Sequence, residues 1–282
     1  MVEAACGMSK RYKVVITGSS GMLGTDLSRE LSSDFIVEGT DLVRNQKSRI
    51  KRFWKADITD GKRVSAVLLK TKPDFVIHCA AWADVDGCEL DKAKADRVNF
   101  TGSKNVALAC KKCGATMIYI STDFVFDGTK KCPYRENDAT HPLSSYGESK
   151  LRGERAVQET LDTYFVLRTS WLYGTNGKNF VDTIIAKGRA GSPLKIVNDQ
   201  SGSPTYTQDL SKAIHALLKK AVGSRNVRYG VYHVSGVGKV SWFAYAREIL
   251  KLAGCRVKVA PISSVELARP AVRPSMSVMD NS

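Results

Sequence analysis

The chain has 282 residues, 43% of them hydrophobic, which is enough for one large α/β domain with a smaller lobe. No apolar run approaches the roughly 20 residues of a membrane-spanning helix. The formal charge of +15 is high, but lysines and arginines are spread along the whole chain without a basic arm, so we expect a basic surface that favours anionic nucleotide ligands, with neither a nucleic-acid nor a membrane partner.

The cysteines and the N-terminus indicate the compartment. The seven cysteines are an odd number, and the one Cys-x-x-Cys pair, Cys110 and Cys113, has no second pair to complete a zinc site. This pattern predicts reduced cytosolic thiols and no metal site. Residues 1–12 contain no apolar core of signal-peptide length, so we expect a disordered leader at residues 1–9 and a cytoplasmic protein.

The first predicted strand, Lys13 to Thr17, is a β-branched run typical of a buried strand. A turn with the spacing Gly-x-x-Gly-x-x-Gly follows it, and a helical stretch continues to Leu31. Such a turn lets backbone amides approach a pyrophosphate at the helix N-terminus. The sequence therefore predicts a dinucleotide site made by Gly18, Ser20, Gly21, Met22, Leu23 and Gly24.

The second predicted strand, Phe35 to Asp41, ends in a carboxylate. Asp41 lies about where an acidic residue bonds the adenosine ribose hydroxyls of a dinucleotide. Arg44, three residues later, can instead meet a 2′-phosphate. Both readings stay open, so the expected cofactor is NADPH or NADH.

The fourth predicted strand lies within residues 73–81, and its exit is small and apolar. Ala80 and Ala81 would let the cofactor lie close to the backbone. His78 sits in an apolar strand, so we expect a packed core histidine there rather than a catalytic base. The fifth predicted strand runs from Thr116 and exits at Thr122, whose hydroxyl can reach a substrate carbonyl because ligands gather at the carboxyl ends of parallel strands.

Tyr146 and Lys150 lie four residues apart in a stretch of helix-compatible residues. This spacing stacks the two side chains on one helix face. An ammonium beside a phenol stabilises the phenolate, so we expect Lys150 to lower the pKa of Tyr146 and to make it a proton donor or acceptor near neutrality. Alternating strands and helices through the first 170 residues or so predict an α/β fold with a doubly wound parallel sheet.

The glycine-rich turn together with Tyr-x-x-x-Lys resembles the short-chain dehydrogenase/reductase superfamily. Further stretches resemble one of its extended families, the dTDP-4-dehydrorhamnose reductases, over nearly the whole chain: residues 80–86, 121–128, 145–150, 168–174, 179–181, 199–207, 232–236 and 273–274. The resemblance implies reduction of the C4 ketone of dTDP-4-dehydro-L-rhamnose to dTDP-L-rhamnose with hydride from a nicotinamide.

The resemblance also implies roles for individual residues. Tyr146 would donate the proton, Lys150 would assist it and anchor the ribose, and Thr122 would polarise the carbonyl. Asn99 would support the active site. The matching cofactor contacts are Asp57 and Ile58 on the adenine and Ala80, Ala81 and Trp82 at the strand exit, and the matching substrate contacts are Asp84, Val85, Asp123, Phe124 and Trp171.

Position 124 departs from the family pattern, which usually has Tyr there. The related sugar-nucleotide 4,6-dehydratases carry Glu at this position, and Phe124 cannot transfer a proton, so we expect no elimination chemistry. Two alternatives stay open. The chain can be a reductase of another 4-keto sugar nucleotide, or a non-catalytic NADP-binding regulatory subunit resembling the beta subunit of methionine adenosyltransferase.

The resemblance divides the chain into two parts. Residues 10–173 and about 206–235 would form the Rossmann domain, and about 174–205 with 236–282 a smaller lobe that binds the sugar nucleotide. Four cationic side chains are available there for the substrate diphosphate, without a ranking among them: Arg189, Lys195, Arg269 and Arg273. Family members often pair, which allows a homodimer, although no sequence feature marks an interface.

Overall fold

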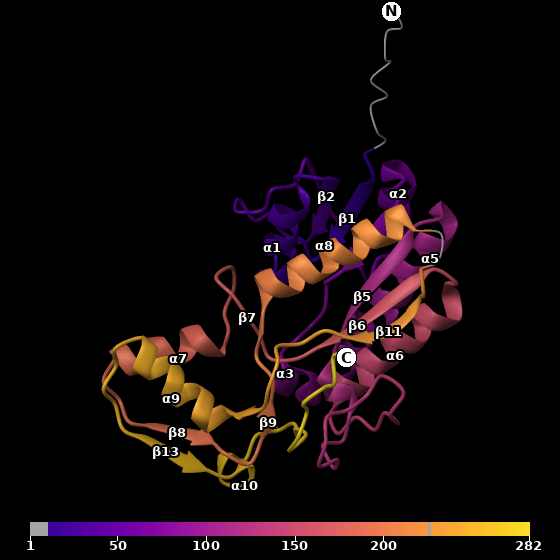
Figure 1. Cartoon of the computed structure of the whole chain (residues 1–282). Coiled ribbons are helices and arrows are strands. Elements are labelled where there is room, and N and C mark those ends of the chain that lie inside the picture. The colour runs from indigo at the N-terminus through magenta and orange to yellow at the C-terminus, as the bar shows by residue number, and fades with distance from the viewer. Residues whose placement is uncertain (1–10, 225–226) are drawn as a thin grey trace, which may run out of the picture.

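The central feature of the computed structural model is a seven-stranded sheet in which every neighbouring pair is parallel (Figure 1). The structure describes residues 11–224 and 227–282, so the leader expected at residues 1–9 lies outside the described residues. The strand order is β11 (Gly230–His233), β6 (Tyr164–Thr169), β5 (Thr116–Thr122), β4 (Phe75–His78), β1 (Lys13–Thr17), β2 (Ile36–Asp41) and β3 (Arg52–Lys55). The predicted doubly wound parallel sheet is confirmed.

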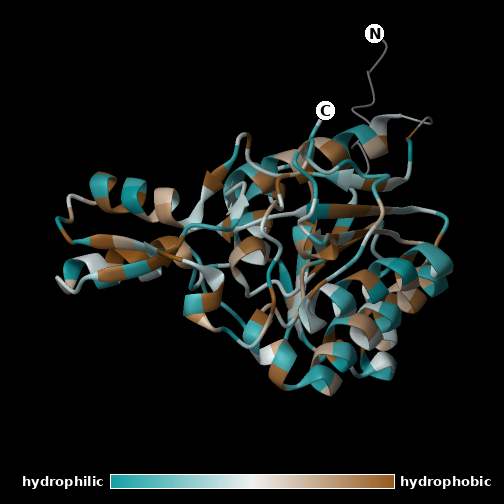
Figure 2. Ribbon diagram, turned by 90° about the horizontal axis from the view of Figure 1, so that it is seen from below, coloured by the Kyte–Doolittle hydropathy of each residue, from teal (hydrophilic) through white to brown (hydrophobic). Residues whose placement is uncertain are grey.

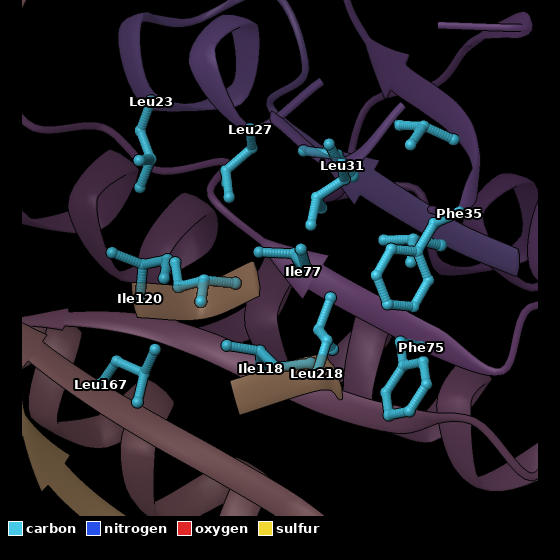
Figure 3. Packing of buried hydrophobic residues seen from close by; sticks show 14 of the residues in the cluster. Leu23, Leu27, Leu31, Phe35, Phe75, Ile77, Ile118, Ile120, Leu167 and Leu218 are labelled. Carbon is cyan, nitrogen blue, oxygen red and sulfur yellow. The ribbon is translucent and has the colours of Figure 1, made fainter. Parts of the chain in front are cut away.

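Alternation along β1 sends its side chains to two different cores. Val14 and Ile16 pack under α1 (Met22–Leu31) and α8 (Thr207–Gly223), where Leu27 and Leu218 are fully buried (Figure 3). Val15 faces the opposite core, beneath α2 (Gly61–Thr71), α5 (Ser103–Cys113) and α6 (Ser145–Thr160). Because the strand is buried on both faces, its sequence reads as a continuous apolar run rather than an alternating one.

The connection from β4 to α5 is helical but not uniform. Asp84 caps α3 (Val85–Leu90) by accepting a hydrogen bond from the Gly87 amide, and Asp91 caps α4 (Lys92–Ala95) in the same manner. A π-helical turn, η1 (Asp96–Gly102), then leads into α5. Such turns recur at functional sites, and this one contains Asn99, which is fully buried.

A smaller lobe stands apart from the sheet (Figures 1 and 2). It contains α7 (Phe180–Arg189), β8 (Leu194–Val197), α9 (Trp242–Leu252), β13 (Val259–Ile262) and α10 (Ser264–Leu267), with β8 and β13 paired in parallel. Its own core is formed by Ile184, Leu194, Ala246, Ile249 and Leu250. Two short pairs join it to the larger part: β7 (Leu172–Tyr173) with β10 (Thr205–Tyr206), and β9 (Ser201–Gly202) with β12 (Val240–Ser241).

The last residues of the chain return to the larger part of the molecule. Met279 forms a bridge with Tyr134 and packs into a small buried cluster with Phe126. The end of the stretch expected to belong to the lobe, from about residue 276, therefore contacts both parts, because Met276 also bridges to Ser201. Among the residues that the structure describes, no helix is long and apolar enough to cross a membrane.

Candidate active site

A cavity of about 770 Å³ lies between the carboxyl ends of the sheet strands and the lobe. Its size suits a nucleotide-scale ligand. Eleven of the residues predicted from the sequence to be catalytic or to contact cofactor or substrate line this cavity: Met22, Leu23, Ala81, Asp84, Val85, Thr122, Asp123, Phe124, Tyr146, Lys150 and Trp171. The remaining predicted residues lie outside the lining: Gly18, Ser20, Gly21, Gly24, Asp41, Arg44, Asp57, Ile58, Ala80 and Trp82.

The glycine-rich turn at the start of α1 fits a dinucleotide. Gly18 has φ +68°, and a Cβ there would lie 2.6 Å from the backbone nitrogen of Ala80. A Cβ at Gly24 would lie 2.2 Å from the carbonyl oxygen of Gly18. Gly21 is the N-cap of α1 and supplies no side-chain cap, so the first amides of the helix stay available to an anion beside Met22 and Leu23.

Asp41 lies at the end of β2, where its carboxylate accepts hydrogen bonds from the amides of Ser20 (2.9 Å) and Leu42 (2.7 Å). These bonds tie the end of β2 to the glycine-rich turn. Arg44 is exposed in the loop that follows. Asp57 is exposed and closes a local turn at Thr59, and Ile58 is only 7% exposed within the core beneath α2 and α5.

Lys150 is fixed in the interior by its surroundings. It is 3% exposed, its Nζ donates a hydrogen bond of 2.7 Å to the Ile120 carbonyl, and the ammonium lies 4.2 Å from the ring centre of Tyr119. Burial lowers the pKa of Lys150 to about 8, and the carboxylate of Glu154 acts in the opposite direction. Lys150 therefore stays largely charged near neutrality.

Tyr146 differs from the sequence prediction. Burial raises its pKa, a hydrogen bond with the Thr122 side chain opposes this, and the nearby Asp123 adds to it. The predicted lowering by Lys150 was wrong, because the ammonium is directed to the Ile120 carbonyl instead. With its pKa raised, Tyr146 keeps its proton until a stronger base appears beside it. Its ring meets that of Phe124 edge to face at 5.6 Å.

Thr122 and Asp123 form a second pair at the exit of β5. The Thr122 hydroxyl accepts a hydrogen bond from the Phe124 amide (3.2 Å) and donates one to Asp123 Oδ1 (3.1 Å). Asp123 is 1% exposed, and its Oδ2 has no hydrogen-bond partner among the described residues. Burial raises the pKa of this carboxyl to about 7, so a neutral and a charged form are both accessible near neutrality.

Asn99 holds the loop after β4, whose residues Asp84 and Val85 line the cavity. Its side chain accepts a hydrogen bond from the Trp82 amide, donates one to the Trp82 carbonyl, and donates another to Ser149 Oγ of α6 at 3.1 Å. The expectation that His78 is a core residue is confirmed: it is 1% exposed between Thr17 and Ser103, and burial lowers its pKa to about 3.

Trp171 stacks on a partner that sequence reasoning missed. Its indole lies 3.5 Å from that of Trp242, at an interplanar angle of 7°, and its backbone has φ +47°. Gly202 packs closely on the same ring, since a Cβ there would lie 2.5 Å from Trp171 Cε2. These contacts hold the indole as a fixed wall of the cavity. Trp242 is the first residue of α9 and follows the N-cap Ser241. This cap could have located the start of the helix in the sequence, but it could not have shown that Trp242 stacks on Trp171.

Among the cationic side chains considered for the diphosphate, Lys195, Arg269 and Arg273 line the cavity and Arg189 does not. The two arginines already meet Asp86, which accepts from Arg273 Nη1 and Nη2 at 2.9 Å each and from Arg269 at 3.0 Å. Burial raises the pKa of Asp86, but these bonds outweigh it and lower the pKa overall. Lys178 and Lys187 add two further ammonium groups to the wall.

Comparison with known proteins places the chain in a family. The family model described as the RmlD substrate binding domain matches residues 12–282. A dTDP-4-dehydrorhamnose reductase from Streptomyces griseus is 39% identical, with 96% of this chain and 86% of the relative aligned. A dTDP-4-keto-6-deoxy-D-glucose reductase from Streptomyces niveus is 33% identical, over 94% of this chain and 87% of the relative.

A solved structure agrees with the sequence relatives. The crystal structure of dTDP-4-dehydrorhamnose reductase from Bacillus anthracis in complex with NADP superposes with a TM-score of 0.88 at 38% identity, covering 97% of this chain and 92% of that one. Matches of this extent, joined to the glycine-rich turn and to the Tyr146 and Lys150 pair, establish the family. The chain belongs to the dTDP-4-dehydrorhamnose reductases, a family of extended short-chain dehydrogenases/reductases.

Proposed function

We propose that this protein reduces the C4 ketone of dTDP-4-dehydro-L-rhamnose to dTDP-L-rhamnose with NADPH or NADH. The observation that carries the proposal is the meeting of Thr122, Tyr146 and Lys150 at the floor of the cavity, next to the open start of α1. A hydroxyl donor, a phenol and a buried ammonium are the groups that reduction of a ketone needs. The named relatives support the same substrate class.

In the proposed reaction the protein supplies the proton and stabilises the charge. A bound nicotinamide supplies hydride to the C4 carbon. Tyr146 gives its proton to the oxygen that develops negative charge, and the Thr122 hydroxyl donates a hydrogen bond to the same oxygen. The Lys150 ammonium lines the same cavity, and we assign it to a ribose hydroxyl of the bound cofactor.

The lobe is proposed to hold the nucleotide sugar. Trp171 and Phe124 give the cavity apolar walls, while Asp84 and Asp123 offer acceptors for sugar hydroxyls. The ammonium groups of Lys178, Lys187 and Lys195 meet no carboxylate among the described ion pairs, so we assign the diphosphate to them rather than to Arg269 and Arg273, which Asp86 occupies. Ordinary charge attraction between lysines and phosphate supports this assignment.

Two features bear on the choice of cofactor. Asp41 at the end of β2 favours a free ribose and thus NADH, whereas the exposed Arg44 can meet the 2′-phosphate of NADPH. The Bacillus anthracis relative was solved with NADP, which favours NADPH here. We therefore propose that both cofactors serve and that NADPH is preferred.

A reductase of another 4-keto sugar nucleotide is the second candidate, and the relative from Streptomyces niveus supports it. Phe124 lacks the hydroxyl usual in the family, and it lies against Tyr146 where the sugar would be held. A purely regulatory NADP-binding subunit is less well supported, because Thr122, Tyr146 and Lys150 are all present and all line the cavity.

The test is turnover with defined substrates. Oxidation of NADPH and NADH would be followed by nicotinamide absorbance with dTDP-4-dehydro-L-rhamnose and, separately, with dTDP-4-keto-6-deoxy-D-glucose. The proposal expects the first sugar to give the higher kcat/KM. Preference for the second sugar would support the alternative reductase. Cofactor binding without turnover on either sugar, combined with capture of a methionine adenosyltransferase catalytic subunit, would support the regulatory reading.

A further inference from the structure

A buried ion pair lies directly behind the catalytic lysine. Glu154 follows Lys150 by one helical turn on α6, and its carboxylate meets Arg168 of β6 through two bonds, Nε to Oε1 at 3.0 Å and Nη2 to Oε2 at 2.8 Å. Ser121 of β5 donates a further hydrogen bond of 2.5 Å to Oε1. Ser121 and Arg168 are partners in the register of the two strands, so the sheet itself fixes this arrangement.

The pair is almost completely removed from solvent. The side chain of Glu154 is 1% exposed and that of Arg168 is 5% exposed. Burying two charges costs several kcal/mol for each ion, which a well-bonded pair only about recovers. A plain apolar contact between α6 and the sheet would hold the helix as well. The ion pair therefore calls for an explanation beyond attachment of the helix.

The surroundings of Lys150 supply one. The groups around its ammonium are His78 and Cys79 at the end of β4, Tyr119 of β5 and Glu154 on its own helix, with Arg168 of β6 behind Glu154. His78 is held neutral by burial, and burial raises the pKa of Cys79 to about 12, so neither carries charge near neutrality. Glu154 is thus the carboxylate that offsets the burial of the ammonium.

We propose that Glu154, fixed by Arg168 and Ser121, is a positioning residue that keeps Lys150 charged within the active site. The residue touches neither substrate nor cofactor and acts through Lys150. Arg168 and Ser121 hold the carboxylate at one place and leave no freedom for it to turn toward the ammonium and form a closed pair. Lys150 consequently keeps its charge while its Nζ stays directed to Ile120 and the cavity.

The inference rests on the proposed reductase function only for its effect on turnover. In the proposed reaction charged Lys150 holds the cofactor ribose, so activity falls as pH rises through the lysine pKa of about 8. Loss of the Glu154 charge lowers that pKa, and the alkaline limb of the pH profile moves to lower pH. A single nearby charge shifts a pKa by roughly one unit, so the charged fraction of Lys150 and with it the activity at about pH 8 should fall roughly fivefold.

The test compares Glu154→Gln with Glu148→Gln, an exposed glutamate on the same helix. Titration of Lys150 is followed by NMR of protein labelled with ¹³C-lysine, with the signal assigned by its loss in Lys150→Met. This readout needs no substrate, so it separates failure of this proposal from failure of the proposed function. We expect a midpoint lower by roughly one pH unit in Glu154→Gln and unchanged in the control.

A second pair of variants covers misfolding. Glu154→Asp keeps the charge and should bring the midpoint back toward that of the wild type. If Glu154→Gln does not fold because Arg168 is left unpaired, the double variant Glu154→Gln/Arg168→Gln removes both charges and should still lower the midpoint. A folded variant that loses thermal stability while Lys150 titrates as in the wild type would show a merely structural role and overturn the proposal.

Discussion

The carboxyl of Asp123 should make this protein less stable as pH rises. It is 1% exposed, and its Oδ2 has no hydrogen-bond partner among the residues described here, so burial outweighs the opposing effect of the Ser277 and Thr122 side chains on its pKa. Burial raises its pKa from 3.8 to about 7. The folded state therefore binds this proton more tightly than the unfolded state. Stability from this group is complete below about pH 4 and is lost as pH rises toward 7.

The size of the effect follows from the two pKa values. A difference of roughly three pKa units corresponds to about 4 kcal/mol of unfolding free energy, of which about 3 kcal/mol falls between about pH 5 and pH 8. Asp123→Asn has nearly the same shape, can still accept from Thr122, and cannot ionise. Between about pH 5 and pH 8, the unfolding free energy of the variant should therefore rise relative to that of the wild type by about 3 kcal/mol.

Urea unfolding of both proteins at about pH 5 and pH 8 measures this difference. Asp162→Asn, at an exposed position, controls for the general effect of removing one negative charge. We expect the free-energy gap between Asp123→Asn and the wild type to widen with pH, and that between the control and the wild type to stay constant. A gap for Asp123→Asn that does not change with pH would show that Asp123 ionises normally, and the reasoning from burial would be refuted.

Two other substitutions test the glycine-rich turn and the pairing of Asp86 with the two arginines of the cavity. Gly18→Ala should abolish tight NADPH binding, because the added Cβ would overlap the backbone at Ala80 and the residue has a positive φ. Gly114 also has a positive φ, but a Cβ there would have no atom within 4 Å. Gly114→Ala should therefore lower the unfolding free energy only by the backbone strain, roughly 1–2 kcal/mol. Fluorescence titration with NADPH and thermal melts distinguish the two. Asp86→Asn should free Arg269 and Arg273 to meet the substrate diphosphate and lower KM for the nucleotide sugar roughly tenfold with little change in kcat, while Asp209→Asn, in an exposed pair, should leave both parameters unchanged.

Local sequence patterns predicted the architecture because strands, turns and helix starts depend mainly on residues that are close together in the chain. The β-branched run before Gly18 and the glycine spacing after it determine a strand, a tight turn and the start of a helix, and each appears where expected. The Tyr146 and Lys150 spacing likewise placed both side chains on one helix at the cavity.

Tertiary contacts account for what the sequence left out. The pKa of Tyr146 was predicted in the wrong direction because spacing says nothing of the Ile120 carbonyl, which takes the Lys150 ammonium. The stack of Trp171 on Trp242 joins residues about 70 positions apart, and neither position is unusual for a buried aromatic by itself. In the sequence Glu154 is indistinguishable from any other helical glutamate, because its partners Ser121 and Arg168 come from β5 and β6.

In the proposed reaction, hydride passes to C4 of the nucleotide sugar and a proton passes from Tyr146 to its oxygen. The most direct measurement uses reduced cofactor carrying deuterium at its transferable position, with dTDP-4-dehydro-L-rhamnose, for the wild type and for Tyr146→Phe. We expect one deuterium at C4 of dTDP-L-rhamnose and a loss of kcat of roughly 100-fold or more in the variant, with cofactor affinity nearly unchanged. Product without deuterium at C4, or a variant with wild-type turnover, would contradict the account.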